Sequence, residues 1–306
     1  MVKLKKFFNA IEKRSWKKIV IGTPFLWMLL LFLVPFVFVF QISLTELADT
    51  RPPYSTMIEW VGDTAFSIKL IFDNYVLLWE DDLYFVSYIN SIKVAFAATL
   101  GCLIIGYTMA YAIARAAPAK RNIMLLAVIM PFWTSFLLRV YAWMGLLANH
   151  GIINNLLLWM GIIDEPLQIM YTNTAMFIVF VYSYLPFMIL PLYACLEKLD
   201  TTLDEAAADL GARPITAFLT ITLPLSMPGI IAGCMLTFIP AIGEYVVPSM
   251  VGGPDSLMIG RVLFDEFFGN VDWPVACAVA VVLLILLVIP FMVYEHYNSR
   301  MEEGNQ

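Results

Sequence analysis

Six long apolar stretches, separated by polar loops, dominate the pattern of hydrophobic and polar positions along the chain. The first covers residues 19–44 and contains no charged residue. A stretch of this length can cross a lipid bilayer as a helix. Within the fifth, Gly229 and Gly233 have GxxxG spacing, which lets helices approach closely. The pattern predicts an all-α integral membrane domain over residues 19–297, with six transmembrane helices at 19–44, 88–114, 122–147, 173–196, 227–247 and 273–294.

The composition agrees with a polytopic membrane protein. Of the 306 residues, 61% are hydrophobic and 14% are charged, whereas a soluble domain has about half and about a quarter, respectively. The four cysteines show no metal-ligand or redox-motif spacing, and two histidines are too few for a histidine-rich metal site. The basic residues cluster at a membrane border, so no nucleic-acid function is indicated.

The positive charges are distributed unevenly between alternate loops. Of the 18 Lys and Arg residues, seven lie in the basic tail 1–18, and six lie in the loops after spans two and four and in the tail 298–306. Only three lie in the alternate loops, and the long loop 45–86 carries eight acids. Because loops rich in Lys and Arg stay in the cytoplasm, both termini and the loop 197–226 are predicted to be cytoplasmic. The acidic loops are predicted to face outward.

A polar segment between the fourth and fifth spans organises the second half of the chain. It begins with four acids, Asp200, Asp204, Glu205 and Asp209. Gly211 interrupts the helical pattern, and Pro214 suits the first turn of a second helix. Pro224 and Pro228 follow, and both are disfavoured inside a helix. The pattern predicts two short helices and a bend on the membrane surface, exposed to a partner outside the membrane.

The spacing in this segment resembles the EAA loop of permease subunits of ABC importers. Glu205-Ala206-Ala207 is followed after three residues by Gly211, and after nine more by Ile221 and then Leu223-Pro224. In that family the loop forms coupling helices that dock on the ATP-hydrolysing subunit. The residues predicted to couple to the ATPase are Glu205, Ala206, Ala207, Gly211, Arg213 and Pro224. For Arg213, a partner subunit, Asp209 and a lipid headgroup all remain open as contacts.

Three charged residues lie within the predicted spans, where charges are costly and usually functional or paired. Lys93 is near a span end and is expected to reach the interface. Arg139 and Glu244 either pair with each other, or Glu244 faces a cavity and attracts a cationic substrate. Nearby aromatic rings offer cation–π surfaces, although Trp and Tyr also populate membrane interfaces generally. The predicted substrate path comprises Glu244, Tyr245, Trp133, Tyr141, Arg139 and Tyr184.

Other stretches are similar to permeases of polyamine importers. The likeness is carried by residues 130–143, 239–248 and 252–255, and Arg51-Pro52-Pro53-Tyr54 in the first outer loop resembles the putrescine-importer version. The resemblance implies a type I ABC importer permease (MetI-like) fold in a bacterial cytoplasmic (inner) membrane. It implies three kinds of partner: a second homologous permease, two copies of an ATP-binding subunit and an extracytoplasmic polyamine-binding protein. ATP and Mg would be bound by the ATPase subunit, and this chain would bind no cofactor.

Alternatives to a putrescine importer differ in their solute or in their class of protein. The chain contains no G-x-x-x-x-G-K-[ST] loop and no nucleophile–base arrangement, so it is not expected to be an enzyme by itself. An ABC permease for an iron complex, an anion or a sugar stays open as an alternative. A standalone secondary transporter is disfavoured, because inverted repeats and mid-membrane coupling-ion carboxylates are not evident.

Overall fold

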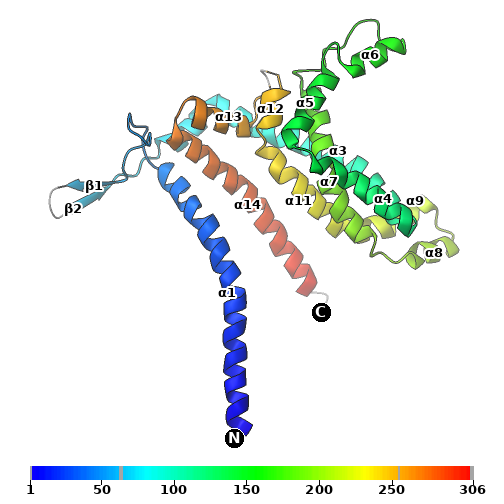
Figure 1. Cartoon of the computed structure of the whole chain (residues 1–306), viewed down its shortest axis with the longest axis horizontal. Helices are drawn as coiled ribbons and strands as arrows, with labels where there is room; N and C mark the ends of the chain where they lie inside the picture. Colours follow the sequence, from blue (N-terminus) through cyan, green and yellow to red (C-terminus); the bar gives the residue numbers. More distant parts are fainter. Residues whose placement is uncertain (1, 62–64, 254–255, 304–306) are drawn as a thin grey trace. The chain divides into compact units, whose positions relative to one another are not determined.

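The chain forms two compact units in the computed structural model, which describes residues 2–61, 65–253 and 256–303 (Figure 1). One unit combines Met1–Glu80 with Glu266–Gln306, and the other is Asp81–Asp265. Two parts of the sequence prediction lie outside the described residues: Pro254 and Asp255 of the polyamine-permease likeness, and 304–306 of the C-terminal tail.

Three helices form the core of the second unit: α3 (Asp82–Ala114), α7 (Asn173–Leu196) and α11 (Met227–Ile242). The first two begin at side-chain caps. The Asp81 carboxylate accepts a hydrogen bond from the Leu83 amide at 2.8 Å, and the Thr172 hydroxyl accepts one from the Ala175 amide at 3.2 Å. The three helices pack against one another side by side (Figure 1).

Glycines allow these helices to approach closely. A Cβ atom at Gly229 of α11 would lie 2.7 Å from the Cβ of Cys195 and 3.1 Å from the carbonyl of Pro191, both on α7. A Cβ at Gly233 would lie 2.7 Å from the sulfur of Met188. The prediction that the GxxxG pair permits close helix contact is therefore confirmed, and α7 is the helix contacted.

The third predicted span is not one continuous helix. Residues 122–147 contain the end of α4 (Pro118–Ile129), a 3-10 turn η1 (Met130–Trp133) and α5 (Phe136–Leu147). Pro131 has no N–H to donate to the preceding turn, and Thr134 adopts extended backbone angles. The Thr134 hydroxyl donates to the Pro131 carbonyl at 2.7 Å, which stabilises the break. The short helix α6 (Ile152–Trp159) follows α5.

The polar segment folds into short helices: α8 (Thr202–Asp209), α9 (Pro214–Ala217), the π-helical turn η2 (Phe218–Thr222) and α10 (Leu223–Leu225). The axes of Pro214–Leu225 and Met227–Ile242 differ by 65°. Helix α11 ends at Ile242, earlier than the predicted end at Val247, because Gly243 and Glu244 leave the helix before α12 (Val246–Met250). Then come α13 (Ile259–Phe264) and the π turn η3 (Asp265–Gly269).

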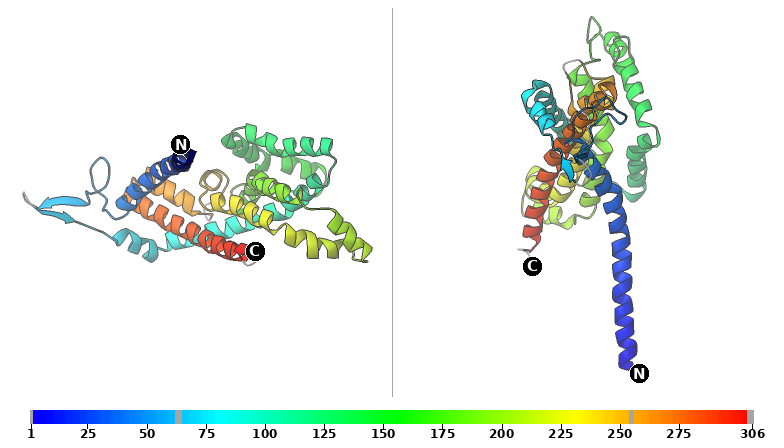
Figure 2. Two further views of the ribbon diagram at one scale, coloured as in Figure 1. Left: turned by 90° about the horizontal axis from the view of Figure 1, so that it is seen from below. Right: turned by 90° about the vertical axis from the view of Figure 1, so that its left-hand side faces the viewer.

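The other unit contains α1 (Val2–Ile42), α2 (Asp73–Glu80) and α14 (Trp273–Glu303). Helix α14 contacts both α1 and α2. Figures 1 and 2 show α1 and α14 closest where α1 ends and α14 begins. Two short antiparallel strands, β1 (Ile58–Val61) and β2 (Ala65–Ile68), pair with Ile58 opposite Ile68 and add a small hairpin to an otherwise helical fold.

The predicted outer loop 45–86 is held to the end of α1 by hydrogen bonds. The Asn74 amide donates to the carbonyls of Ser43 at 2.9 Å and Thr45 at 2.8 Å. The hydroxyls of Ser43 and Tyr75 lie 2.7 Å apart, and Lys69 pairs with Glu46 at 3.0 Å. These contacts join the residues that directly follow α1 to the start of α2 and to Lys69.

Four helical stretches in the described part of the chain are long and apolar enough to cross a membrane: Val20–Ile42, Asp82–Ala114, Phe136–Trp159 and Asn173–Leu196. The bent pair Pro214–Leu225 and Met227–Ile242 makes a fifth if it counts as one span. Trp273–Val288 is apolar but shorter. The number of six spans therefore stays a prediction.

We expect Gly229→Ala to destabilise the chain. The added methyl group would meet Cys195 Cβ and the Pro191 carbonyl, which are not the ends of flexible side chains, so overpacking should cost about 1–3 kcal/mol. Thermal unfolding in detergent measures the effect. The matched control is Gly145→Ala on α5, where a Cβ meets no atom within 4 Å. A melting temperature for Gly229→Ala equal to that of the control would contradict the close-packing argument.

Candidate functional site

Asp200 lies two residues before helix α8 and binds its first residue. The Asp200 carboxylate accepts a hydrogen bond from the Thr202 amide at 3.0 Å, which satisfies a free donor of the first turn. Hydrogen bonds from Thr202 hold the pKa of the Asp200 carboxyl below its usual value. Of the predicted motif residues on α8, Glu205 and Ala206 are exposed and Ala207 is buried. The helix therefore packs on one face and presents its acid on the other.

Gly211 ends α8 in a way that requires glycine. Its φ angle is +83°, in the left-handed region that other residues adopt at a cost. The Gly211 amide donates to the Ala208 carbonyl and the Ala212 amide to the Ala207 carbonyl, both at 2.9 Å. These two bonds form a Schellman motif, which turns the chain toward α9. A Cβ at Gly211 would meet no atom within 4 Å, so the constraint is conformational rather than steric.

The solvent-exposed surface of this segment combines charged and apolar side chains. Arg213 and Pro224, like Glu205, are exposed. Leu210 is 89% exposed and Ile215 is 67% exposed. Large apolar side chains beside charges on a surface are typical of a protein-binding site. Arg213 forms no ion pair with Asp209 in the described structure, so that contact, which the sequence left open, is not formed.

Asp204 attaches α8 to the rest of the unit. One carboxylate oxygen accepts a hydrogen bond from the guanidinium of Arg115 at 2.7 Å, and the other accepts one from the Thr222 hydroxyl at 3.0 Å. Arg115 follows directly after the last residue of α3, and Thr222 ends the π turn η2. Sequence reasoning missed this role. Two features of the sequence are compatible with such a contact: an acid in the first turn of α8, and a basic loop predicted on the same side of the membrane.

A second ion pair joins the neighbouring helix ends. Arg121 of α4 donates to the Glu197 carboxylate at 2.6 Å, just beyond α7, and to the Ala114 carbonyl at 3.0 Å, the last residue of α3. A cation at a helix C-terminus also interacts favourably with the helix dipole. The ends of α3, α4 and α7 are thus held together beside the α8–α10 segment.

Glu244 lies between α11 and α12 and has two hydrogen-bond donors. One carboxylate oxygen accepts from the Tyr184 hydroxyl at 2.7 Å, and the other accepts from the Val246 amide at 3.0 Å, a free donor of the first turn of α12. Tyr184 is 6% exposed on α7, and Glu244 is partly exposed. The carboxylate is therefore held in place while still reachable.

Arg139 and Glu244 do not form the ion pair that was one of the sequence predictions. In the described part of the chain, the guanidinium of Arg139 lies over the rings of Phe132 at 4.8 Å and Phe136 at 5.6 Å, and it makes no ion pair. Phe132 belongs to the turn η1 at the break, and its ring lies beside Arg139 of α5. Phe132 contacts Phe187 at 5.2 Å, and Phe187 contacts Tyr184 at 6.2 Å.

Aromatic rings therefore connect the two charges. The connection runs from Arg139 through Phe132 and Phe187 to Tyr184 and ends at Glu244. The other aromatic residues of the predicted path lie elsewhere. Tyr245 stacks on Phe264 at 4.2 Å, while Trp133 is 74% and Tyr141 55% exposed. The six predicted residues are thus only partly brought together.

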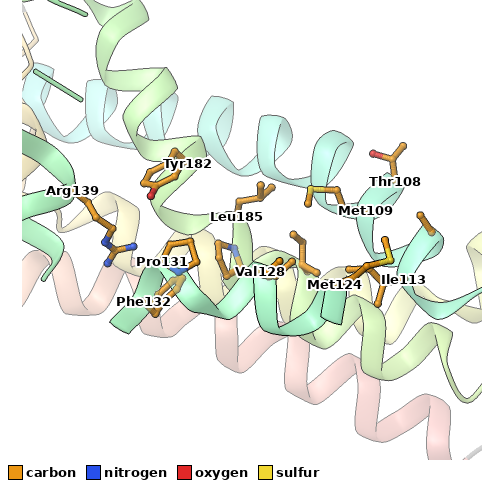
Figure 3. A pocket seen from close by; sticks show the side chains of 14 residues that line it. Thr108, Met109, Ile113, Met124, Val128, Pro131, Phe132, Arg139, Tyr182 and Leu185 are labelled. Carbon is orange, nitrogen blue, oxygen red and sulfur yellow. The ribbon is translucent and has the colours of Figure 1, made fainter. Parts of the chain in front are cut away.

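Arg139 also borders a pocket of about 560 Å³ between α3, α4, η1, α5 and α7. In Figure 3 Arg139 lies at one end of the pocket, and Thr108 and Ile113 lie at the other. The lining between them is mainly aliphatic, with Tyr182, Leu185 and Met124 among the side chains shown. In the residues that the structure describes, no group of His, Cys, Asp and Glu is arranged to hold a metal ion.

Comparison with known proteins places the chain in a family. The family of binding-protein-dependent transport system inner membrane components matches residues 103–303. The chain belongs to this family. It is 43% identical over 234 residues to the spermidine/putrescine transport system permease protein PotB of Escherichia coli K12, covering 76% of this chain and 85% of that protein. It is 37% identical over 289 residues to the protein of the same name from Haemophilus influenzae, covering 94% and 96%.

Solved structures of ABC transporters show the same fold. One chain of a bacterial transporter that imports the acidic polysaccharide alginate matches with a TM-score of 0.73 at 15% identity, covering 96% of this chain and 99% of that one. A chain of the MetNI methionine transporter matches with a TM-score of 0.54 at 17% identity, covering 72% and 96%. The predicted helical fold of an importer permease is confirmed.

Membership of this family also settles the class of activity. The family consists of membrane permease subunits of ABC transporters, which are not enzymes by themselves. Together with its apolar helices, this makes the chain a multi-pass inner membrane protein with a transport role. The segment α8–α10 and the Glu244 region both lie within the matched residues 103–303.

Proposed function

We propose that this chain is one permease subunit of an ATP-driven importer for polyamines, with putrescine as its principal substrate. The observation that carries the proposal is the 43% and 37% identity to permeases named for spermidine and putrescine, over most of both chains. The Arg51-Pro52-Pro53-Tyr54 stretch supports putrescine within that class, because it resembles the putrescine-importer version.

The chemistry of the chain supports a cationic substrate. A polyamine carries several ammonium groups, which bind carboxylates and the faces of aromatic rings. Glu244 offers a partly exposed carboxylate fixed by Tyr184 and the Val246 amide. Exposed acids of the loop 45–86, among them Glu80 and Asp81, would raise the local concentration of a cation near the outer surface.

The α8–α10 segment is the proposed attachment site for an ATPase. Its exposed Glu205 and Arg213 can form ion pairs with a partner, and its exposed Leu210 can enter an apolar pocket. The proposed complex contains a second homologous permease, two copies of an ATP-binding subunit that hold ATP and Mg, and an extracytoplasmic polyamine-binding protein. The bias of Lys and Arg supports a cytoplasmic position for this segment and for both termini.

We expect putrescine to stimulate ATP hydrolysis by the reconstituted complex more strongly than spermidine, an anion or a sugar does. The permease accepts substrate from the binding protein and passes the signal to the ATPase. The measurement is ATPase activity with each solute and with the binding protein present. Stimulation by an anion or a sugar, but by neither polyamine, would support the role as a permease subunit and contradict the proposed polyamine substrate.

We expect Glu205→Lys and Gly211→Asp to uncouple ATP hydrolysis from transport while leaving membrane insertion intact. The first reverses a charge on the exposed face of α8. The second places a side chain at φ +83°, where the Schellman motif needs glycine. Substrate-stimulated ATPase activity measures coupling. Asp164→Lys, in an exposed loop distant in sequence, is the charge-reversal control. Normal stimulation in both α8-region variants would contradict the proposed docking site.

We expect Glu244→Gln to reduce polyamine uptake by about tenfold, because it loses one charge-assisted hydrogen bond to ammonium. Gln keeps an oxygen that can accept from Tyr184 or from the Val246 amide, so assembly should be retained. Uptake of radiolabelled putrescine into proteoliposomes is the measurement. Glu165→Gln, in an exposed loop, removes the same charge as a control. Unchanged uptake in Glu244→Gln would assign Glu244 only a structural role.

A further inference from the structure

Two tyrosines of α3 and the arginine that directly follows this helix contact the polar segment. Tyr107, Tyr111 and Arg115 are spaced four residues apart, so they lie in a row along the end of the helix. The guanidinium of Arg115 lies over the Tyr111 ring at 5.5 Å, which joins two of them directly. We call this row the α3 face.

The α3 face contacts the segment at three residues, Ser226, Phe218 and Asp204. The hydroxyls of Tyr107 and Ser226 lie 2.9 Å apart, and Ser226 is the residue at the bend between α10 and α11. Phe218, at the start of the π turn, packs edge-on against both tyrosines, at 5.5 Å from Tyr107 and 6.0 Å from Tyr111. Arg115 pairs with Asp204 of α8 at 2.7 Å.

Asp204 is the residue of α8 that binds the α3 face. The contacts that Tyr107 and Tyr111 make with the segment go to Phe218 and Ser226. Among the interactions of the described residues, the Arg115–Asp204 pair therefore joins the α3 face to α8. The second oxygen of Asp204 also binds Thr222 at the end of the π turn. Both carboxylate oxygens are used, and the side chains of Asp204 and Arg115 are 30% and 24% exposed.

We propose that Asp204 is a positioning residue that transmits movement of α8 to the α3 face, and from there to α7 and α11. The inference rests on the proposed function, because it takes α8 as the helix on which the ATPase acts. A pull on α8 is carried by a charge-assisted pair that resists separation. The aromatic contacts and the Tyr107–Ser226 bond move the bend of α11 with it.

The test compares Asp204→Asn with Asp209→Asn in the reconstituted complex. Both substitutions remove one charge from α8, but Asp209 is exposed and makes no ion pair in the described structure. The readout is the number of putrescine molecules taken up per ATP hydrolysed. We expect Asp204→Asn to lower this ratio at least about fivefold, as a lost coupling between sites does. Asp209→Asn should keep the wild-type ratio.

Exchanging the two charged residues distinguishes a specific role of the Asp204–Arg115 pair in coupling from a general role of Asp204 in folding. The double variant Asp204→Arg with Arg115→Asp rebuilds the pair in reverse and should recover most of the ratio. If the Asp204→Asn complex does not assemble, Arg115→Gln breaks the same pair by changing its other member. It should lower the ratio of putrescine to ATP by the same factor. A wild-type ratio in the single variants, or a fall that the exchange does not restore, would overturn the inference.

Failure of the proposed function gives a different result. A wild-type complex that takes up no putrescine would reject the substrate, while amide hydrogen exchange would still test the link. We expect the amides of α8 to exchange at least about fivefold faster in Asp204→Asn than in Asp209→Asn. Equal exchange in the two variants would overturn the inference even where transport is normal.

Discussion

Met188 lies in the middle of α7 and contacts glycines from two other helices. A Cβ at Gly106 of α3 would lie 2.9 Å from the Met188 side chain, and one at Gly233 of α11 would lie 2.7 Å from its sulfur. Glycine at both positions therefore lets α3 and α11 pack closely against α7 at the same residue. Tyr107 follows Gly106 directly, so the contact that sets Gly106 against α7 also sets the direction of the tyrosine hydroxyl toward Ser226.

The features that could be predicted from the sequence are those that depend on residues close together along the chain. Long apolar stretches, the Gly211 bend and the GxxxG pair each follow from the local preference of the backbone, and all three are found in the structure. The break at Pro131 divides a stretch that the sequence predicts as one span. It depends on Thr134, whose hydroxyl binds the Pro131 carbonyl and lets the chain leave the helix before α5 begins.

The contacts that could not be predicted join residues far apart in the sequence. Asp204 and Arg115 are 89 residues apart, and nothing in either local pattern selects one partner over the other basic residues on that side. The predicted Arg139–Glu244 pair was wrong for a related reason. Opposite charges in two predicted spans suggest an ion pair, but the rotation of each helix determines whether the two side chains meet. Glu244 instead accepts hydrogen bonds from the Tyr184 hydroxyl and the Val246 amide, because it lies outside α11 in the turn before α12.

The separation of the two membrane charges bears on what the chain can carry. An arginine within a span costs roughly 2.5–3.5 kcal/mol, and each cation–π contact returns roughly 0.5–2 kcal/mol. The rings of Phe132 and Phe136 can thus offset much of the cost of Arg139 without a carboxylate. Glu244 is left with neutral donors and with no cation of the described chain in ion-pair range. A carboxylate without a cationic partner is available to an ammonium group, whereas a carboxylate already paired with Arg139 could bind one only by breaking that pair.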